Sequence, residues 1–277
     1  MRNTKIISVF NQKGGVGKTS FTLNFATTLT YFSKEVMNKE EVKVLIIDND
    51  SQSNATFILS NGLLDDAISE NKNIITIEQI LKDRALTIHK SAVTSKFKNI
   101  DVICSTVDHA STDLKIMYEP ENTDILRKRI DGAIGLYDFI LIDNPPQIGL
   151  STLNSLSCSD YCIAPIEGSV FSVKGLNNLV GLIRDINEAK VKKEPLKLIT
   201  FLNKVDNRKK INIVRVKKTL ERLLDTAFIK NEHISLSTAS SDCFEEMETC
   251  MTFKKSTTNK KEYIALTKSI LTRMEEI

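Results

Sequence analysis

Residues 11–20 read NQKGGVGKTS, and this stretch decides the fold. An apolar run at 6–10 precedes it, and apolar residues at helical spacing follow it from Phe21 to Leu29. The order is therefore strand, glycine-rich loop and helix. Glycines at positions 14, 15 and 17 allow a tight loop whose backbone N–H groups point inward, where phosphate groups can accept them at the positive end of the helix. We expect a nucleoside triphosphate site here.

Two side chains at the end of this loop complete the expected site. Lys18 places a positive charge beside the β and γ phosphates, and the Thr19 hydroxyl can ligate Mg²⁺. A chance glycine-rich turn is the alternative, but the strand and the helix at the correct places on either side argue against it. The sequence therefore predicts a nucleotide bound together with Mg²⁺.

Apolar strands alternate with amphipathic stretches along most of the chain. This alternation predicts an α/β fold, with a mostly parallel, doubly wound sheet and helices on both faces. We expect strands at 6–10, 42–47, 100–104, 139–142, 161–165 and 198–202. We expect helices at 124–134, 173–186, 213–224 and 262–277, and short helices in an insertion at 60–94. No repeat or proline-rich linker divides the 277 residues, so a single P-loop domain over 1–277 is expected.

Three aspartates follow expected strands at their carboxyl ends, where ligands bind in sheets of this kind. Asp48 and Asp50 come at the end of the strand at 42–47, and Asp143 closes the strand at 139–142. Asp143 is in a Walker B arrangement, which can hold the water shell of Mg²⁺. Residues 48–51 are also good turn formers by themselves, but their place beside the phosphate loop favours a functional site.

The loop departs from the common phosphate-loop pattern in an informative way. Gln12 stands where the pattern has its first glycine, and a second lysine, Lys13, follows it. KGGVGKT with this extra lysine resembles the deviant Walker A loop of the ParA/MinD family of ATPases, and NQKGGVGKT resembles the ParA/Soj partition branch most closely. The resemblance implies an ATP-dependent homodimer in which Lys13 reaches the nucleotide of the other subunit.

The resemblance extends to the first pair of aspartates. Residues 48–56 read DNDSQSNAT and resemble the family's switch I, D-x-D-P-Q-G-N-A-T. The resemblance implies that Asp50 orients the attacking water and that Asp48 lies nearer Mg²⁺. Ser51 replaces the family's proline and Ser53 its glycine, so a looser loop is expected.

Two further segments match the family. Residues 143–154, DNPPQIGLSTLN, resemble switch II, whose two prolines stiffen a loop that senses the γ phosphate. Residues 165–175, PIEGSVFSVKG, resemble P-x-Q-x-E-x-F-x-x-x-G, with Glu167 and Ser169 in place of the usual glutamine and glutamate. The framework is retained in this segment while its polar contacts have changed.

The base-binding residues are expected at the end of a later strand. Asn203-Lys204-Val205-Asp206 has the N-K-x-D form that selects guanine in GTPases. In ParA-like proteins this strand end also contacts the base, usually with a preference for ATP. We therefore expect ATP with Mg²⁺, and GTP remains the alternative.

These patterns together give a full set of expected site residues. Lys13, Lys18 and Asp50 are expected to be catalytic. Mg²⁺ is expected at Thr19, Asp48 and Asp143. The nucleotide is expected to contact Lys13, Gly14, Gly15, Val16, Gly17, Lys18, Thr19, Ser20, Asn203 and Asp206.

Positive charge is concentrated in the last third of the chain. The net charge is +3, but residues 1–189 carry 19 Lys and Arg against 23 Asp and Glu, whereas residues 190–277 carry 19 against 12. A basic region on a near-neutral body suits a protein that binds the DNA backbone, although lysines also keep helices solvated. The expected DNA contacts are Arg208, Lys209, Lys210, Lys217 and Lys218. The family's DNA-binding segment, I-P-R-N-x-R-x-S-E-A, falls near 228–239, which reads FIKNEHISLSTA and lacks both arginines.

No membrane attachment is expected. No apolar run approaches the ~18 residues of a membrane span, and the first residues lack the long apolar stretch of a signal peptide. The closing segment ends with acidic residues, unlike the basic membrane-targeting helix of MinD proteins. We expect a cytoplasmic protein that associates with the nucleoid when it holds ATP.

The expected function is that of a ParA-type partition ATPase. The resemblance implies that the ATP-bound dimer binds DNA without sequence preference, and that hydrolysis stimulated by a ParB-like partner releases it to segregate a plasmid or chromosome. One alternative is a nucleotide-switched positioning protein whose cargo is a protein assembly. The other is a small-molecule amidoligase or kinase on the same architecture.

Overall fold

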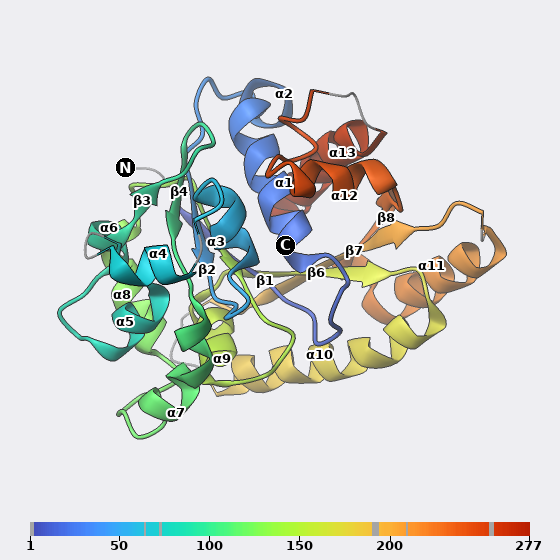
Figure 1. Cartoon of the computed structure of the whole chain (residues 1–277). Helices are drawn as coiled ribbons and strands as arrows, with labels where there is room; N and C mark the ends of the chain where they lie inside the picture. Colours follow the sequence, from blue (N-terminus) through green and yellow to red (C-terminus); the bar gives the residue numbers. More distant parts are fainter. Residues whose placement is uncertain (1–2, 64, 72–73, 190–193, 209, 255–257) are drawn as a thin grey trace.

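A single twisted sheet forms the centre of the molecule. The structure, a computed structural model, describes all residues except 1–2, 64, 72–73, 190–193, 209 and 255–257. The described strands are β1 (Lys5–Val9), β2 (Val44–Asp48), β3 (Val93–Thr94), β4 (Ile100–Ile103), β5 (Phe139–Asp143), β6 (Tyr161–Glu167), β7 (Lys197–Val205) and β8 (Phe228–Ser235). They form an eight-stranded sheet in the order β3-β4-β2-β5-β1-β6-β7-β8 (Figure 1). Neighbouring strands are parallel except β3 and β4, so the expected mostly parallel α/β sheet is confirmed.

Helices cover both faces of this sheet (Figure 1). One face carries α1 (Lys18–Tyr31), α2 (Ser33–Met37), α12 (Thr238–Glu245) and α13 (Thr258–Glu276). The opposite face carries α9 (Leu150–Cys158), α10 (Val170–Glu188) and α11 (Lys210–Leu224). Short helices gather near β2 and β4, namely α3 (Asn54–Leu59), α4 (Asp65–Glu70), α5 (Ile77–Lys82), α6 (Ile88–Ser91), α7 (Thr112–Ile116) and α8 (Ile125–Ile130). Three 3₁₀ turns complete the described elements, η1 (Val107–Ser111), η2 (Asp131–Ala133) and η3 (Asp225–Ala227).

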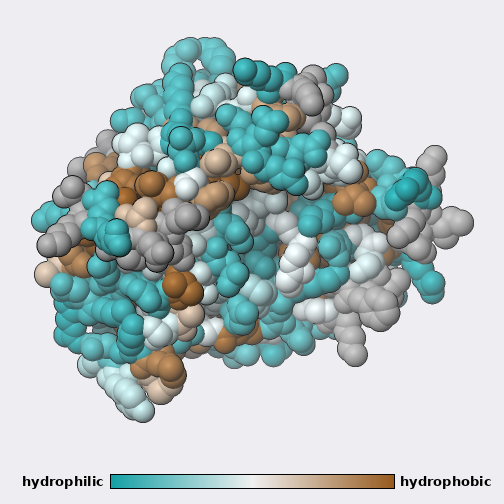
Figure 2. All heavy atoms as spheres, in the orientation of Figure 1, coloured by the Kyte–Doolittle hydropathy of each residue, from teal (hydrophilic) through white to brown (hydrophobic). Residues whose placement is uncertain are grey.

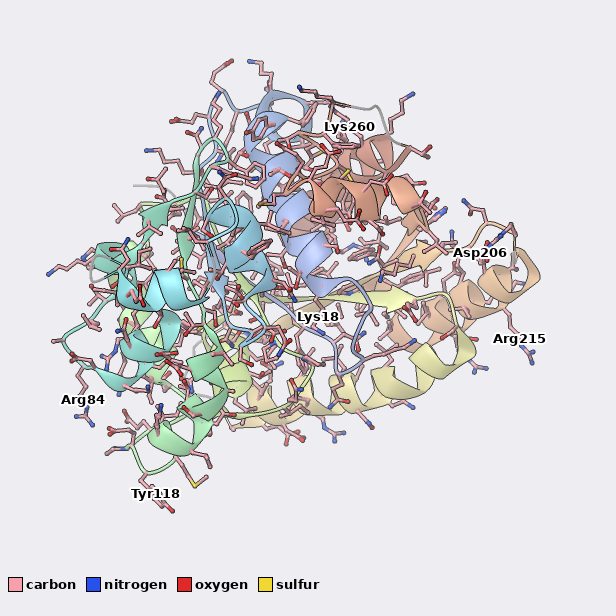
Figure 3. All side chains as sticks on the ribbon, in the orientation of Figure 1. Lys18, Arg84, Tyr118, Asp206, Arg215 and Lys260 are labelled. Carbon is pink, nitrogen blue, oxygen red and sulfur yellow. The ribbon has the colours of Figure 1, made fainter. Side chains whose placement is uncertain are left out.

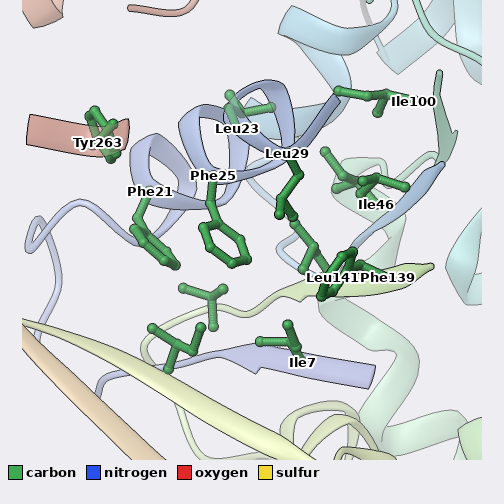
Figure 4. Packing of buried hydrophobic residues seen from close by; sticks show 14 of the residues in the cluster. Ile7, Phe21, Leu23, Phe25, Leu29, Ile46, Ile100, Phe139, Leu141 and Tyr263 are labelled. Atoms are coloured by element: carbon green, nitrogen blue, oxygen red, sulfur yellow. The ribbon is translucent and has the colours of Figure 1, made fainter. Parts of the chain in front are cut away.

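Aromatic packing under α1 fixes the helix against the sheet. The Phe21 ring lies 5.2 Å from the Phe25 ring and 4.8 Å from the Phe201 ring, measured between centroids. Figure 4 shows Phe21 and Phe25 pointing from α1 toward the strands, with Ile7 of β1 below them. Each fully buried side chain of this size contributes about 2–3 kcal/mol of hydrophobic stabilisation. The start of α1, and with it the glycine-rich loop, is therefore held at a fixed place above β1.

The structure differs from the sequence-based expectation at the two edges of the sheet. Strands β3 and β8 were not expected. Ile77 and Ile80 of α5 are fully buried in the same cluster as Ile47 of β2. Residues 60–94 thus contain short helices, as expected, and α5 contributes to the core.

The surface carries apolar side chains below the sheet, in the part of the chain that contains η1 and α7. Val107 is 61% exposed, Leu114 69% and Tyr118 89%. Figure 2 shows hydrophobic atoms over this region, and Figure 3 shows Tyr118 at its tip. Within the described residues, no helix combines the length and the apolarity that crossing a membrane requires.

Candidate nucleotide-binding site

The glycine-rich loop leaves β1 and enters α1 through a left-handed turn. Gly15 has a φ of 73° and Gly17 a φ of 89°, which is the backbone region that favours glycine. Gly17 is also crowded, because a Cβ built there would lie 2.5 Å from Nδ2 of Asn203. Val16 is fully buried and anchors the loop, while Gly14 and Gly15 face solvent. Two glycines are thus required by backbone geometry, and one of them also by contact.

Lys18 turns back onto the loop that precedes it. Its Nζ donates to the backbone oxygen of Asn11 at 3.2 Å and to that of Lys13 at 3.5 Å. Burial lowers the pKa of Lys18, while the charges of Asp143 and Asp50 raise it. A buried ammonium at the N-terminus of a helix attracts phosphate strongly, since both the helix dipole and the low local polarity favour an incoming anion.

Asp48 and Asp143 lie side by side, because they are register partners at the carboxyl ends of β2 and β5. Burial, followed by the charge of Asp143, raises the pKa of Asp48 to about 7. Burial also raises the pKa of Asp143 to about 6. Oδ2 of Asp143 accepts a hydrogen bond from Thr19 Oγ1 at 2.6 Å, and Oδ1 accepts one from Thr22 Oγ1 at 3.0 Å. Hard oxygen ligands of this kind fit Mg²⁺, and a cation here would relieve the repulsion between the two carboxylates.

Residues 48–56, called switch I below, fold around the Asp48 carboxylate. Oδ2 of Asp48 accepts hydrogen bonds from the Thr56 backbone N–H at 2.8 Å and from Thr56 Oγ1 at 2.7 Å. Oδ1 of Asp48 accepts one from the Asp50 N–H at 3.2 Å. Oδ1 of Asp50 accepts one from the Gln52 N–H at 3.0 Å. The structure thus places Asp143 against Thr19 and turns Asp48 toward its own loop. Asp50 lies close enough to Lys18 for its charge to oppose the lowering of the Lys18 pKa by burial.

Asn49 connects switch I to residues 143–154, called switch II below. Its Nδ2 donates to Asn144 Oδ1 at 2.9 Å and to the Ser151 backbone oxygen at 3.1 Å. The Oδ1 atom of Asn49 lies 3.1 Å from Nε2 of His109. Because an amide oxygen only accepts, Nε2 carries the proton. The other ring nitrogen, Nδ1, lies 3.1 Å from Thr112 Oγ1. Sequence reasoning missed this network, because His109 is 60 positions from Asn49 and no local spacing indicates the contact.

Asp113 of α7 caps α9, the helix that begins within switch II. Its carboxylate accepts hydrogen bonds from the Leu150 N–H at 3.0 Å, the Ser151 N–H at 2.8 Å and Ser151 Oγ at 2.6 Å. A carboxylate at this position stabilises the first turn of α9 through its hydrogen bonds and through the helix dipole. The apolar surface segment at 107–118 is therefore tied to both switches, through His109 and through Asp113.

The ends of β6 and β7 support the glycine-rich loop from the other side. Nδ2 of Asn203 donates to the Val16 backbone oxygen at 2.8 Å, and Nζ of Lys204 donates to that of Gly15 at 2.6 Å. Glu167, at the end of β6, forms an ion pair with Lys13. Sequence reasoning did not predict these supporting roles for Lys204 and Glu167.

Asp206, an expected base-binding residue, and Arg208, an expected DNA-binding residue, pair with each other just beyond β7. Asp206 holds Arg208 through two hydrogen bonds, from Nε at 2.8 Å and from Nη2 at 3.0 Å. Lys218 is exposed and Lys217 is half-buried on α11, which projects from the body of the molecule, and Figure 3 shows the neighbouring Arg215 pointing outward. Lys210 begins α11, and Lys209 lies outside the described residues.

Comparison with known proteins places this site in a family. Residues 4–198 match a family model described as an AAA domain. The chain is 33% identical over 180 residues to the sporulation initiation inhibitor protein Soj of Bacillus subtilis, and the match covers 65% of each chain. This protein belongs to the ParA/Soj family of P-loop ATPases. The family resemblance of its loops is therefore confirmed. The chain spans about half (53%) of the length of two curated Mycobacterium tuberculosis relatives.

Solved structures share the fold over nearly the whole chain. The ATP complex of McdA from Cyanothece has a TM-score of 0.78 at 16% identity, and the match covers 98% of each chain. Cobyrinic acid a,c-diamide synthase from Mycobacterium smegmatis, with ADP and magnesium, has a TM-score of 0.77 at 19% identity and covers 98% of this chain and 96% of that one. At these identities the likeness shows the P-loop fold alone.

Proposed function

We propose that this ParA/Soj family member binds ATP with Mg²⁺, forms a dimer around the nucleotide and hydrolyses it as a molecular switch. The observation that carries the proposal is the convergence of Lys18, Asp50 and the Thr19–Asp143 contact at the end of the glycine-rich loop. This arrangement combines a phosphate cradle, a magnesium site and a carboxylate for water in one place.

Each residue of the site has a defined part in the proposed reaction. The backbone N–H groups of residues 14–19 bind the phosphates, and Lys18 exchanges the loop carbonyls for phosphate oxygens. Thr19, Asp143 and Asp48 would hold a magnesium ion through its water shell, and such an ion would neutralise phosphate charge. Asp50 orients a water for attack on the γ phosphorus. The bond from that phosphorus to the bridging oxygen breaks, which yields ADP and phosphate.

Base recognition is proposed at Asn203 and Asp206, with ATP preferred over GTP. Guanine recognition by an N-K-x-D segment requires the aspartate carboxylate to accept the base's N–H groups. Here both oxygens of Asp206 accept hydrogen bonds from Arg208. This occupancy supports adenine as the preferred base.

The coupling between the switches favours a switch protein over a small-molecule enzyme. Asn49 joins switch I to switch II, and Asp113 ties switch II to a surface element. A change at the γ phosphate can thus reach the surface segment at 107–118, where a ParB-like partner is proposed to bind. We propose that the ATP-bound dimer binds DNA through α11 in the cytoplasm, on the nucleoid, to segregate a plasmid or a chromosome.

The two lysines of the loop provide the decisive experiment. Lys18→Ala removes the ammonium that binds phosphate, so ATP binding should be lost. Lys13→Ala should leave ATP binding within about threefold of normal and abolish dimerisation, since Lys13 is proposed to act on the other subunit's nucleotide. Binding of a fluorescent ATP analogue measures the first property, and light scattering with a non-hydrolysable analogue measures the second. Lys34→Ala, which removes an exposed lysine paired with Glu40, is the control. A normal ATP-induced dimer of Lys13→Ala would exclude the cross-subunit role.

A further inference from the structure

The ammonium of Lys13 is engaged within its own subunit. Its partner is the carboxylate of Glu167, and both side chains are partly exposed, at 43% and 28%. This contact competes with the role proposed for Lys13, which requires the same ammonium to reach the triphosphate of a second subunit. The lysine cannot do both at once, because each position demands its single charged group.

Two backbone contacts place Lys13 for this ion pair. Nδ2 of Asn11 donates to the Pro165 backbone oxygen at 2.9 Å, which attaches the start of the loop to β6 two residues before Glu167. Oδ1 of Asn11 accepts the Lys13 N–H at 3.0 Å. The backbone of Lys13 is thus fixed beside β6, and its side chain has only to extend along the strand to meet Glu167.

Glu167 itself is at a supported position. It ends β6 in register with Asn203 of β7, and Asn203 holds the Val16 carbonyl of the same loop. The carboxylate therefore stands on a framework that does not depend on Lys13. The charge of Glu167 can be removed without removing the loop's support.

We propose that Glu167 is a positioning residue that holds Lys13 on its own subunit until a second subunit presents its nucleotide. The proposal rests on the proposed ATP-dependent dimerisation, which it refines. An exposed or half-exposed ion pair is weak, whereas the triphosphate of the partner carries several negative charges, so the nucleotide displaces the carboxylate. Glu167 then sets the protein and ATP concentrations at which the dimer forms.

The first test measures Lys13 directly and needs no nucleotide. Glu167→Gln keeps the size of the side chain and removes its charge. Limited acylation of lysines, quantified by mass spectrometry, should show Lys13 reacting about two- to fivefold faster in Glu167→Gln, because the ion pair no longer holds its side chain against β6. Glu167→Asp, which keeps the charge, should restore most of the protection. Glu121→Gln, which breaks a comparable exposed pair with Lys128, should leave Lys13 unchanged.

The second test measures dimerisation with a non-hydrolysable ATP analogue. Each dimer releases two Lys13–Glu167 pairs, so the dimer dissociation constant should fall about 2- to 30-fold in Glu167→Gln and stay unchanged in Glu121→Gln. Unchanged acylation of Lys13 would refute the inference whatever dimerisation does. Faster acylation with an unchanged dissociation constant would refute the control of dimerisation. Faster acylation with no ATP-induced dimer in either protein would instead refute the proposed function and leave the ion pair's hold on Lys13 established.

Discussion

The three aspartates of the site differ in the hydrogen bonds that their carboxylates accept. Asp48 accepts hydrogen bonds from Thr56 and Asp50, and Asp143 accepts them from Thr19 and Thr22. Asp50 accepts one from the Gln52 N–H within its own turn. Loss of Asp48 or Asp143 would therefore disturb the loops themselves, whereas loss of Asp50 removes one carboxylate from a short turn. This difference makes Asp50 the residue at which turnover can be separated from binding.

Asp50→Ala should bind ATP, form a long-lived dimer and lose turnover by about 100-fold, because positioning the water stabilises the transition state more than the bound ground state. Phosphate release measures turnover, and light scattering after dilution measures the lifetime of the dimer. Normal hydrolysis by Asp50→Ala would show that another group orients the water.

His109 makes the stability of the nucleotide-free protein depend on pH in a predictable direction. Burial lowers the pKa of His109 to about 4, against 6.5 for the exposed side chain, so the folded protein binds a proton less readily than the unfolded chain. This contribution to stability is complete above pH 6.5 and is lost as the pH falls toward 4. Between pH 7 and pH 5 the loss from this group is about 2 kcal/mol.

His109→Gln removes this titration. At pH 7 the variant should be less stable than the normal protein, because glutamine reproduces the two hydrogen bonds of His109 imperfectly. At pH 5 the difference in unfolding free energy between the two proteins should be smaller by about 2 kcal/mol. Urea unfolding at both pH values measures it, and the other titrating groups cancel because both proteins contain them. Parallel pH profiles for the two proteins would contradict the assignment.

At the scale of the element, switch I holds a serine in a conformation that suits glycine. Ser53 has a φ of 47°, in the left-handed region, at the N-terminus of α3. Ser60, the residue that follows the last residue of this helix, has an ordinary φ of −86°. The two serines therefore provide a matched pair for testing backbone strain.

Ser53→Gly should raise the free energy of unfolding by about 0.5–1 kcal/mol, because glycine adopts this conformation without a clash. Ser60→Gly should lower it by a similar amount, since there glycine only adds freedom to the unfolded chain. Thermal or urea unfolding of the nucleotide-free proteins measures both. Equal destabilisation by the two changes would show that Ser53 is not strained.

Helix α11 is the element on which the proposed DNA binding depends. Val216 and Leu220 are buried against the sheet, and the charged side chains face outward. Replacing Lys217 and Lys218 by glutamate should weaken ATP-dependent binding to unrelated duplexes alike, and each lost phosphate contact should reduce the log–log salt slope by about 0.9. Electrophoretic shifts at several salt concentrations measure this. Glutamates at Lys34 and Lys98, exposed lysines away from α11, should have a smaller effect. An absence of any ATP-dependent complex in the normal protein would favour a protein scaffold in place of DNA.

The sequence predicted the six inner strands of the sheet and missed its two edge strands. The six expected strands are mainly apolar, with at most one polar residue in each, as suits central parallel strands. Strand β8 was missed because exposed Lys230 and Asn231 interrupt its apolar residues, and β3 was missed because it has two residues. The glycine-rich loop is encoded in ten consecutive residues, whereas the contacts of Asn49 and Asp113 join segments that only the fold brings together. Local patterns therefore predict the loop and the family, and the coupling between switches requires the structure.

At the scale of the whole molecule, the glycine-rich loop and both switches lie together at the carboxyl ends of the central strands. The glycine-rich loop follows β1, switch I and switch II follow β2 and β5, and the residues that support the loop end β6 and β7. These strands are neighbours in the sheet although they are far apart in the sequence. A nucleotide bound at these strand ends would lie beside the glycine-rich loop and both switches.

The strand order also determines when the site can first exist. β1 lies between β5 and β6, and Asn203, whose amide supports the loop at Val16, is 187 positions further along the chain. A ribosome that adds about 5–20 residues per second needs roughly 10–40 s to reach Asn203 after it has made the loop. During most of this interval β1 lacks its neighbouring strands β5 and β6, and throughout it the loop lacks the contact with Asn203. The emerging chain is therefore exposed to aggregation, and to rescue by chaperones, until β7 has been made, and only then does the loop gain its contact with Asn203.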